Sequence, residues 1–243
     1  MDMKVWTDTK WNELNSHVQV VARQIERLIE GGNKNTQVKV SEIKISLSIA
    51  WEQDIETVKG LKTLIFLYIV SAFKTLTCIT CSDHAMEYLI AKGFPINEYK
   101  TWSKWLYDMR RHIASLNGTH LPSYEDYMIR YDIKTTFFNK DDLIDSLIFT
   151  VYGFFYRDKS DIDPSEVYKI YKLYILVLVK LLPLDKNLKK LKGVVYVKDK
   201  ISRQNDLWEW VKDVAIRFIK QEYNGINIFK YKISSFRAFE DSI

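Results

Sequence analysis

Apolar residues recur every three or four positions over long stretches of this chain, which is the pattern of amphipathic helices. The first such stretch covers residues 7–30, and Gly31-Gly32 follows it as a stop signal. The stretch 98–116 has the same pattern and is followed by Asn117-Gly118. Long helices with glycine stops therefore predict a mainly helical protein.

The same spacing predicts further helices, some of which carry a recognisable cap. Ser123 caps a short helix to Tyr131, and Asp163-Pro164 opens a helix that ends before Pro183. The remaining predicted helices cover residues 83–92, 139–156 and 201–223.

One region fits two patterns. Residues 43–49 alternate between apolar and polar side chains, as a strand does, but their apolar residues also fit a helix. Because no partner strand lies nearby, we predict a helix from Ser41. A deeply buried helix then covers residues 52–79, with Gly60 as a candidate break.

The predicted architecture is mainly α, a two-lobed or bundle-like body with a small β element late in the chain. The segments 193–197 and 226–236 alternate enough to form that element. With only 8 Gly and 4 Pro in 243 residues, collagen-like and turn-rich β architectures are excluded. We predict a helical body over residues 1–182 and a basic C-terminal lobe over residues 183–243, or a single domain that contains both.

Composition points to a protein that does not span a membrane. The longest apolar runs, 64–73 and 173–179, are far shorter than the roughly 20 residues that a membrane helix needs. The N-terminus lacks the apolar core of a signal peptide, and two cysteines exclude a disulfide scaffold. We therefore expect a reducing compartment, the cytoplasm.

A codon bias is visible in the composition. The chain has 27 Lys against 9 Arg and 26 Ile against 8 Ala, which indicates an AT-rich gene. Many viruses, some bacteria and some protists share this bias. A viral source would place the protein in the virion or in the cytoplasm of the infected cell.

Basic residues cluster although the net charge is only +5. One group lies on the polar side of the predicted helix 98–116, and a denser group follows residue 183. Such clusters attract the phosphate backbone of nucleic acid without reading sequence. The candidate phosphate-binding residues are Lys100, Lys104, Arg110, Arg111, Lys186, Lys189, Lys190, Lys192, Lys198, Lys200, Arg203, Arg217, Lys220, Lys230, Lys232 and Arg237.

Aromatic residues accompany these cations. As a strand, the tail would place Phe229 and Tyr231 on one face, where they could stack on bases. Trp102 and Trp105 are more typical of core residues. The tail also needs a partner for its apolar face, so we expect residues 226–243 to dock, and to do so on a neighbouring subunit of a homo-oligomer.

Metal and catalytic signals are weak by comparison. Cys78 and Cys81 form the one CxxC motif, and His112 and His120 would have to complete a zinc site. We interpret the cysteines as packing residues and expect no metal and no cofactor. The acidic cluster of residues 141–166 suits helix capping and solvation better than Mg²⁺ binding. The chain has no GxSxG elbow and no Gly-rich phosphate loop, so enzymatic activity is not favoured.

Two functions remain. The first is sequence-tolerant binding of nucleic acid, RNA in preference, in the manner of a small viral nucleocapsid-like protein. The second is a helical protein–protein interaction or regulatory protein whose basic surface meets an acidic partner or an anionic membrane surface.

Overall fold

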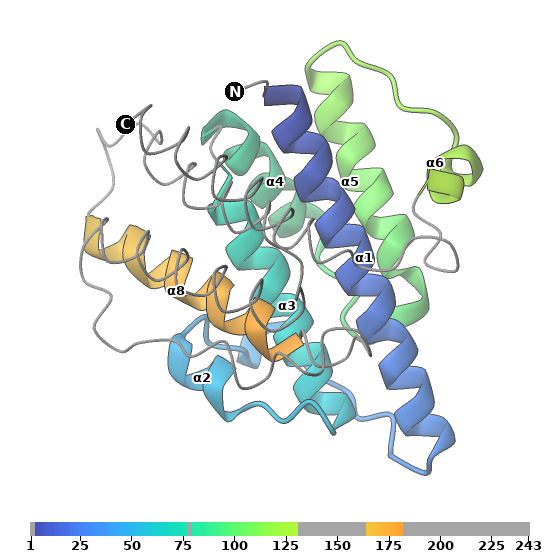
Figure 1. Cartoon of the computed structure of the whole chain (residues 1–243), viewed down its shortest axis with the longest axis vertical. Helices are drawn as coiled ribbons and strands as arrows, with labels where there is room; N and C mark the ends of the chain where they lie inside the picture. Colours follow the sequence, from blue (N-terminus) through green and yellow to red (C-terminus); the bar gives the residue numbers. More distant parts are fainter. Residues whose placement is uncertain (1–2, 77–78, 131–163, 182–243) are drawn as a thin grey trace, which may run out of the picture.

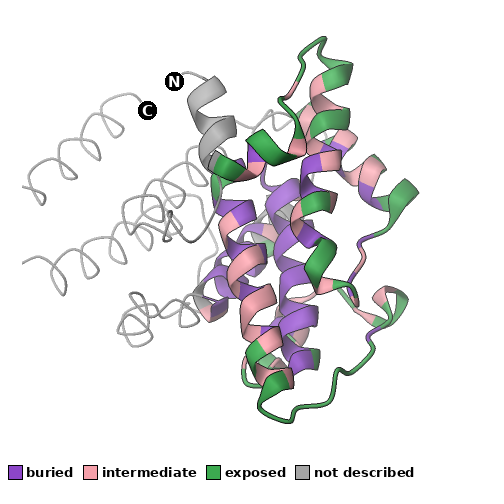
Figure 2. Ribbon diagram, turned by 90° about the vertical axis from the view of Figure 1, so that its right-hand side faces the viewer, coloured by how far each residue is buried: buried purple, intermediate pink, exposed green. Residues whose placement is uncertain are grey.

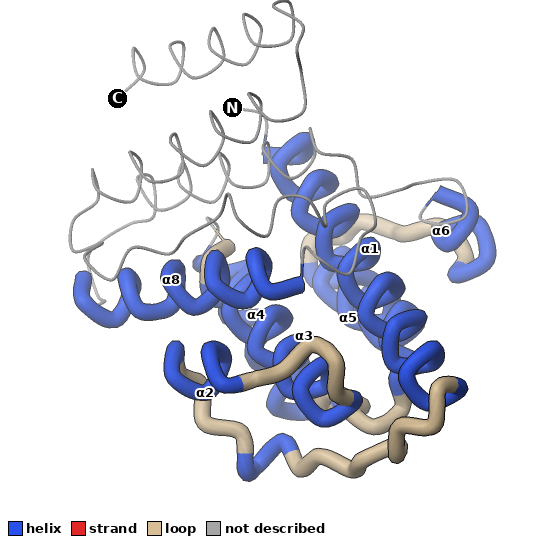
Figure 3. The backbone as a smooth tube through the Cα atoms, turned by 60° about the horizontal axis from the view of Figure 1, so that its bottom comes forward, coloured by secondary structure: helices blue, strands red, loops and turns tan. Residues whose placement is uncertain are grey.

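The computed structural model of the chain describes residues 3–76, 79–130 and 164–181 (Figure 1). In these residues all regular secondary structure is helical, and Figure 3 shows no strand among them. The prediction of a mainly helical protein is thereby confirmed. The late β element and the boundary at residue 183 fall outside the described residues.

The described α-helices are α1 (Met3–Glu30), α2 (Leu47–Glu52), α3 (Val58–Lys74), α4 (Ile79–Lys92), α5 (Trp102–Leu116), α6 (Tyr124–Arg130) and α8 (Pro164–Leu181). Two 3₁₀ turns, η1 (Val40–Glu42) and η2 (Tyr99–Thr101), precede α2 and α5.

The helix α3 forms the centre of the core. It is apolar on every side, and all its residues from Val58 to Phe73 except Lys59 are buried. The helices α1, α2, α4 and α8 pack on it, and α5 packs against α1 and α4 (Figure 1). Figure 2 shows buried residues on the facing sides of these helices and exposed residues on their outer sides. Burial of each large apolar side chain contributes about 1.5–3 kcal/mol.

Glycine ends two of the long helices where the sequence predicts it. At the end of α1 the amide of Asn33 donates to the carbonyl of Leu28 over 2.9 Å, and Gly32 adopts a positive φ of 93°. This is the Schellman arrangement, which a residue with a Cβ adopts only at a cost. Gly118 ends α5 in the same way, with φ 65°.

The boundaries predicted between residues 41 and 79 are wrong. The region contains a 3₁₀ turn, the short helix α2 and the separate helix α3. Ser46 caps α2 by accepting from the amide of Ile49, and Thr57 caps α3 by accepting from the amide of Gly60. The break between the two helices therefore covers residues 53–57 and does not lie at Gly60.

Gly60 has a different role from the predicted one. A Cβ at this position would lie 1.9 Å from the carbonyl oxygen of Asp54. Glycine therefore lets the chain before α3 turn back tightly over the first turn of the helix.

Three other predicted helices are close to the structure. The helix α4 begins at Ile79, earlier than the predicted residue 83, and the first residues of the predicted helix 98–116 form η2. Ser123 caps α6 as predicted, since its hydroxyl accepts from the amide of Asp126 over 3.2 Å. The predicted helices 139–156 and 201–223 lie outside the described residues. None of the helices described is both long enough and apolar enough to cross a membrane.

Candidate functional site

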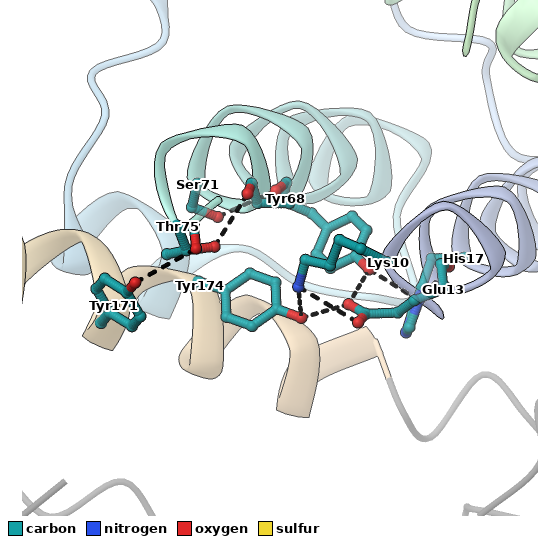
Figure 4. Close-up of polar contacts among 9 residues, drawn as sticks. Lys10, Glu13, His17, Tyr68, Ser71, Thr75, Tyr171 and Tyr174 are labelled. Atoms are coloured by element: carbon teal, nitrogen blue, oxygen red, sulfur yellow. Dashed lines mark hydrogen bonds and ion pairs between the residues drawn. The ribbon is translucent and has the colours of Figure 1, made fainter. Parts of the chain in front are cut away.

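A cluster of polar side chains lies in the interior where α1, α3 and α8 meet (Figure 4). The helix α1 supplies Lys10, Glu13 and His17, which share one face because they are spaced by three and four residues. The other helices supply Tyr68 and Tyr174, both fully buried. Glu13 itself is 2% exposed, so its carboxylate must find its hydrogen-bond partners inside the protein.

The Glu13 carboxylate has such partners from two other helices. Its Oε1 atom accepts hydrogen bonds from the hydroxyls of Tyr68 and Tyr174. Its Oε2 atom lies 3.3 Å from the Nζ of Lys10, which also donates to the Tyr174 hydroxyl. The carboxylate thus connects α3 and α8 to α1 through charge-assisted hydrogen bonds.

His17 extends the cluster along α1. Its Nδ1 lies 2.9 Å from the backbone oxygen of Glu13 and 3.1 Å from the Tyr68 hydroxyl. Because a carbonyl oxygen only accepts, Nδ1 carries the proton in this arrangement. The Tyr68 hydroxyl can then accept from His17 while it donates to Glu13.

Burial shifts the titration of the cluster. It lowers the pKa of Lys10, and the charge of Glu13 opposes that shift. It also raises the pKa of Tyr68 well above 10.0, and the Glu13 charge adds to that increase. Tyr68 therefore stays protonated and continues to donate over the whole physiological range.

The hydrogen bonds described above join members of the cluster to one another. The two tyrosine hydroxyls and the Lys10 ammonium all point at Glu13 or at one another (Figure 4). We therefore assign the cluster to holding α8 against α1 and α3. This cluster was not among the sites predicted from the sequence, although polar residues at three-to-four spacing beside the apolar stripe of α1 are a visible signal for it.

Two further contacts hold α8 in place. The Tyr171 hydroxyl donates to the carbonyl of Thr75 over 3.3 Å. The Nζ of Lys180 donates to the carbonyls of Ala50 at 2.9 Å and Gln53 at 2.7 Å, and to that of Trp51. These carbonyls lie at the C-terminal end of α2, where a cation also interacts favourably with the helix dipole.

A buried cation fixes the loop after α1. The Nζ of Lys62 donates to the carbonyl of Thr36 and to the side chain of Asn35, both at 2.8 Å. Asn97 accepts a longer bond of 3.3 Å from the same ammonium and exchanges two bonds of 2.9 Å with the backbone of Val38. Burial lowers the pKa of Lys62.

The exposed side of α5 carries some of the predicted phosphate-binding residues. The Nζ of Lys104 lies 2.5 Å from Oδ1 of Asp108, and Nη2 of Arg111 lies 3.8 Å from the same oxygen. The side chains of Lys104 and Arg111 are 45% and 62% exposed. Both cations are therefore accessible, but one carboxylate on their own helix pairs with both.

Lys100 and Arg110 lie apart from this group. The Nζ of Lys100 is 3.3 Å from a carboxylate oxygen of Glu26 on α1, in an exposed ion pair. The guanidinium of Arg110 is half-buried, with its Cζ 5.5 Å from the ring centroids of both Trp11 and Tyr127. Arg110 thus packs between α1 and α6 and does not share the exposed side of α5.

The other predicted contacts lie outside the described residues. These are Lys186, Lys189, Lys190, Lys192, Lys198, Lys200, Arg203, Arg217, Lys220, Phe229, Tyr231, Lys230, Lys232 and Arg237. The greater part of the acidic cluster 141–166 lies there too. Trp102 is fully buried and Trp105 half-buried, in agreement with their interpretation as core residues.

Cys81 is not the free packing thiol that the sequence predicts. Cys81 is half-buried and disulfide-bonded, so that interpretation is wrong for it. Cys78 is outside the described residues. A disulfide sulfur is not a thiolate ligand, and the part of the chain that the structure describes holds no group of three or more His, Cys, Asp or Glu arranged for a metal ion.

The described residues form a tightly packed helical body. Asp108 partly neutralises the exposed basic residues on its helix α5. Comparison of the chain with models of protein families, with curated proteins and with solved structures found no match.

Proposed function

We propose that this protein binds single-stranded nucleic acid without reading its sequence, with RNA favoured, as a small viral nucleocapsid-like protein does. The basic segment, residues 182–243, makes most of the phosphate contacts. The helical body carries that segment and contributes a smaller surface on α5.

The distribution of charge carries this proposal. Residues 182–243 contain thirteen Lys or Arg and eight Asp or Glu, which is a net charge of +5. That value equals the net charge of the whole chain, so residues 1–181 are balanced. On α5, the one carboxylate of Asp108 pairs with both Lys104 and Arg111, so this group carries a net charge of about +1. An excess of cations in one segment favours a polyanionic partner.

The chemistry of such binding follows from the residue types. Each lysine that neutralises a phosphate releases a condensed counterion, which makes the affinity depend on salt and not on base sequence. Aromatic rings such as Phe229 and Tyr231 add stacking on bases, worth about 1–3 kcal/mol per base in single-strand binders.

The test is binding of the full-length chain to a fluorescein-labelled, mixed-sequence 20-mer RNA, followed by fluorescence anisotropy. The K189A/K190A/K192A variant should bind more weakly than wild type. The control variant K34A/K44A/K59A removes the same charge from exposed lysines of the body and should bind like wild type. Equal weakening by both variants would contradict the role of the basic segment.

A helical protein–protein interaction protein is the second candidate, and one observation favours it. Trp51 is 63% exposed on α2, and tryptophan is enriched at the energetic centres of protein interfaces. The partner would be an acidic protein, with an anionic membrane surface as the other possibility. The ratio of absorbance at 260 and 280 nm of the purified protein, before and after nuclease and a high-salt wash, separates the two candidates.

Location in the cytoplasm and assembly into a homo-oligomer belong to the same proposal. A nucleocapsid-like role requires the protein to assemble, and truncation of the tail tests whether the tail is needed for assembly.

A further inference from the structure

A row of charged residues with a tyrosine on each side runs along the exposed side of α5, and the role of its one carboxylate has not been assigned above. We name it the α5 face: Lys104, Asp108 and Arg111, with Tyr88 and Tyr124 beside them. Successive residues of an α-helix are rotated by about 100°, so positions 104, 108 and 111 share one side of α5. The side chains of Lys104 and Arg111 are exposed on this side.

The tyrosines come from the helices on either side. Tyr124 of α6 packs on Tyr107 with ring centroids 5.3 Å apart, and the Nζ of Lys104 lies 5.4 Å from the Tyr124 ring centroid. Tyr88 of α4 packs on Trp105 at 5.6 Å. Tyr88 also packs on His112, with ring centroids 5.4 Å apart. Both tyrosines are half-buried, so each is partly exposed beside the charged row.

The charges of the row act on Tyr88. Burial raises the pKa of Tyr88, the charge of Asp108 raises it further, and Arg111 acts in the opposite direction. Tyr124 behaves similarly, with burial and then Asp108 raising its pKa. Asp108 thus influences both tyrosines as well as both cations.

We infer that the α5 face is a second nucleic-acid contact surface, on which Lys104 and Arg111 bind a backbone phosphate and Asp108 competes with that phosphate. The assignment rests on the proposed function. Partly exposed aromatic residues beside exposed cations suit single-stranded nucleic acid, because phosphates can contact the cations and bases can contact the rings. Asp108 occupies both cations in the absence of ligand, and its side chain is only 29% exposed.

If Asp108 competes with the phosphate, removal of its negative charge should strengthen the binding of RNA. Exposed ion pairs are weak, so a phosphate can displace Asp108, but the displaced carboxylate still repels it. D108N should therefore bind a labelled mixed-sequence 20-mer RNA about three- to tenfold more tightly at low salt, because two cations become free to release counterions.

The matched control is E42Q. Glu42 pairs with Lys39 over 3.1 Å in an exposed ion pair on η1, so E42Q removes the same charge and the same kind of contact elsewhere. E42Q should bind like wild type. K104A/R111A should bind more weakly, and Y124L should weaken binding without changing its salt dependence, since stacking releases no counterion. Circular dichroism of each variant checks that the helices are intact.

The outcomes separate this assignment from the proposed function. Tighter binding by D108N than by E42Q supports the assignment. Equal binding by D108N, E42Q and wild type would overturn the assignment and leave the proposed function in place. Failure of the wild-type chain to bind RNA would overturn both.

Discussion

Glu13 and Tyr174 lie 161 positions apart in the chain, and the Tyr174 hydroxyl donates a hydrogen bond to the Glu13 carboxylate in the interior. The segment between them includes residues 131–163, which the structure does not describe. This contact therefore joins α8 to the N-terminal helix across a long stretch of sequence. It also supplies one of the donors that a buried carboxylate needs.

The first prediction concerns this hydrogen bond. Y174F removes the hydroxyl but keeps the ring, so Glu13 loses one donor and Lys10 loses one acceptor. We expect a loss of about 1–3 kcal/mol in the free energy of unfolding, measured by urea denaturation with an unchanged m-value. Y99F, at a half-buried position on the surface, should change stability far less. Equal effects of the two substitutions would contradict the role assigned to the cluster.

The second prediction concerns the buried ion pair. E13L leaves the Lys10 ammonium buried without its anion and should cost about 3–5 kcal/mol. The double variant K10M/E13L removes both charges and should be more stable than E13L alone. A double-mutant cycle measured by denaturant unfolding gives the coupling. If the double variant is as unstable as the sum of the two single variants, Lys10 and Glu13 do not interact as described.

Titration of Tyr68 gives the third prediction. Its pKa is raised in the folded protein, so the unfolded chain releases this proton near pH 10 while the folded chain keeps it. Stability therefore falls as the pH rises above about 10, by about 1.4 kcal/mol per pH unit while only the unfolded chain is deprotonated. Lys10 acts in the opposite direction below about pH 10.5, because its folded pKa is lowered.

The variant Y68F isolates the tyrosine contribution. Its free energy of unfolding should fall less steeply between pH 10 and 11 than that of wild type, whatever its absolute stability. Parallel curves for the two proteins would show that Tyr68 titrates normally in the folded state.

The local pattern of the sequence predicts several helices well, because their signals are local. The apolar stripe and the stop at Gly31-Gly32 define α1, and Asn117-Gly118 defines the end of α5. The boundary between α2 and α3 was missed because it depends on capping by Thr57 and on the close approach of Asp54 to Gly60. Both depend on a tight turn that apolar periodicity does not report.

The polar contacts could not be predicted in the same way. Tyr68 is 55 positions from Glu13, and Tyr174 lies within an apolar run that reads only as core. On α5, periodicity places Lys104 and Arg111 on the polar side correctly, but it does not reveal that Arg110 packs against Trp11. Spacing within α1 shows that its polar residues share one face, but it does not show which residues of other helices they contact, and those partners decide their roles.

The fourth prediction concerns assembly. The tail, residues 226–243, needs a partner for its apolar face, and the proposed partner is a neighbouring subunit. Truncation after Tyr223 should leave the helical circular-dichroism signal nearly unchanged and lower the oligomer mass in light scattering. An unchanged mass would contradict the assembly role, and loss of the helical signal would show that the tail belongs to its own core.

The salt dependence of RNA binding tests the central claim most directly. Binding constants of wild type, K189A/K190A/K192A and K34A/K44A/K59A are measured for one mixed-sequence RNA from about 50 to 200 mM salt, the range over which phosphate contacts weaken strongly. The account predicts a steep slope of log affinity against log salt for wild type, a slope smaller by roughly two to three for the first variant, and a wild-type slope for the second. A slope that K189A/K190A/K192A leaves unchanged would contradict phosphate binding by the basic segment.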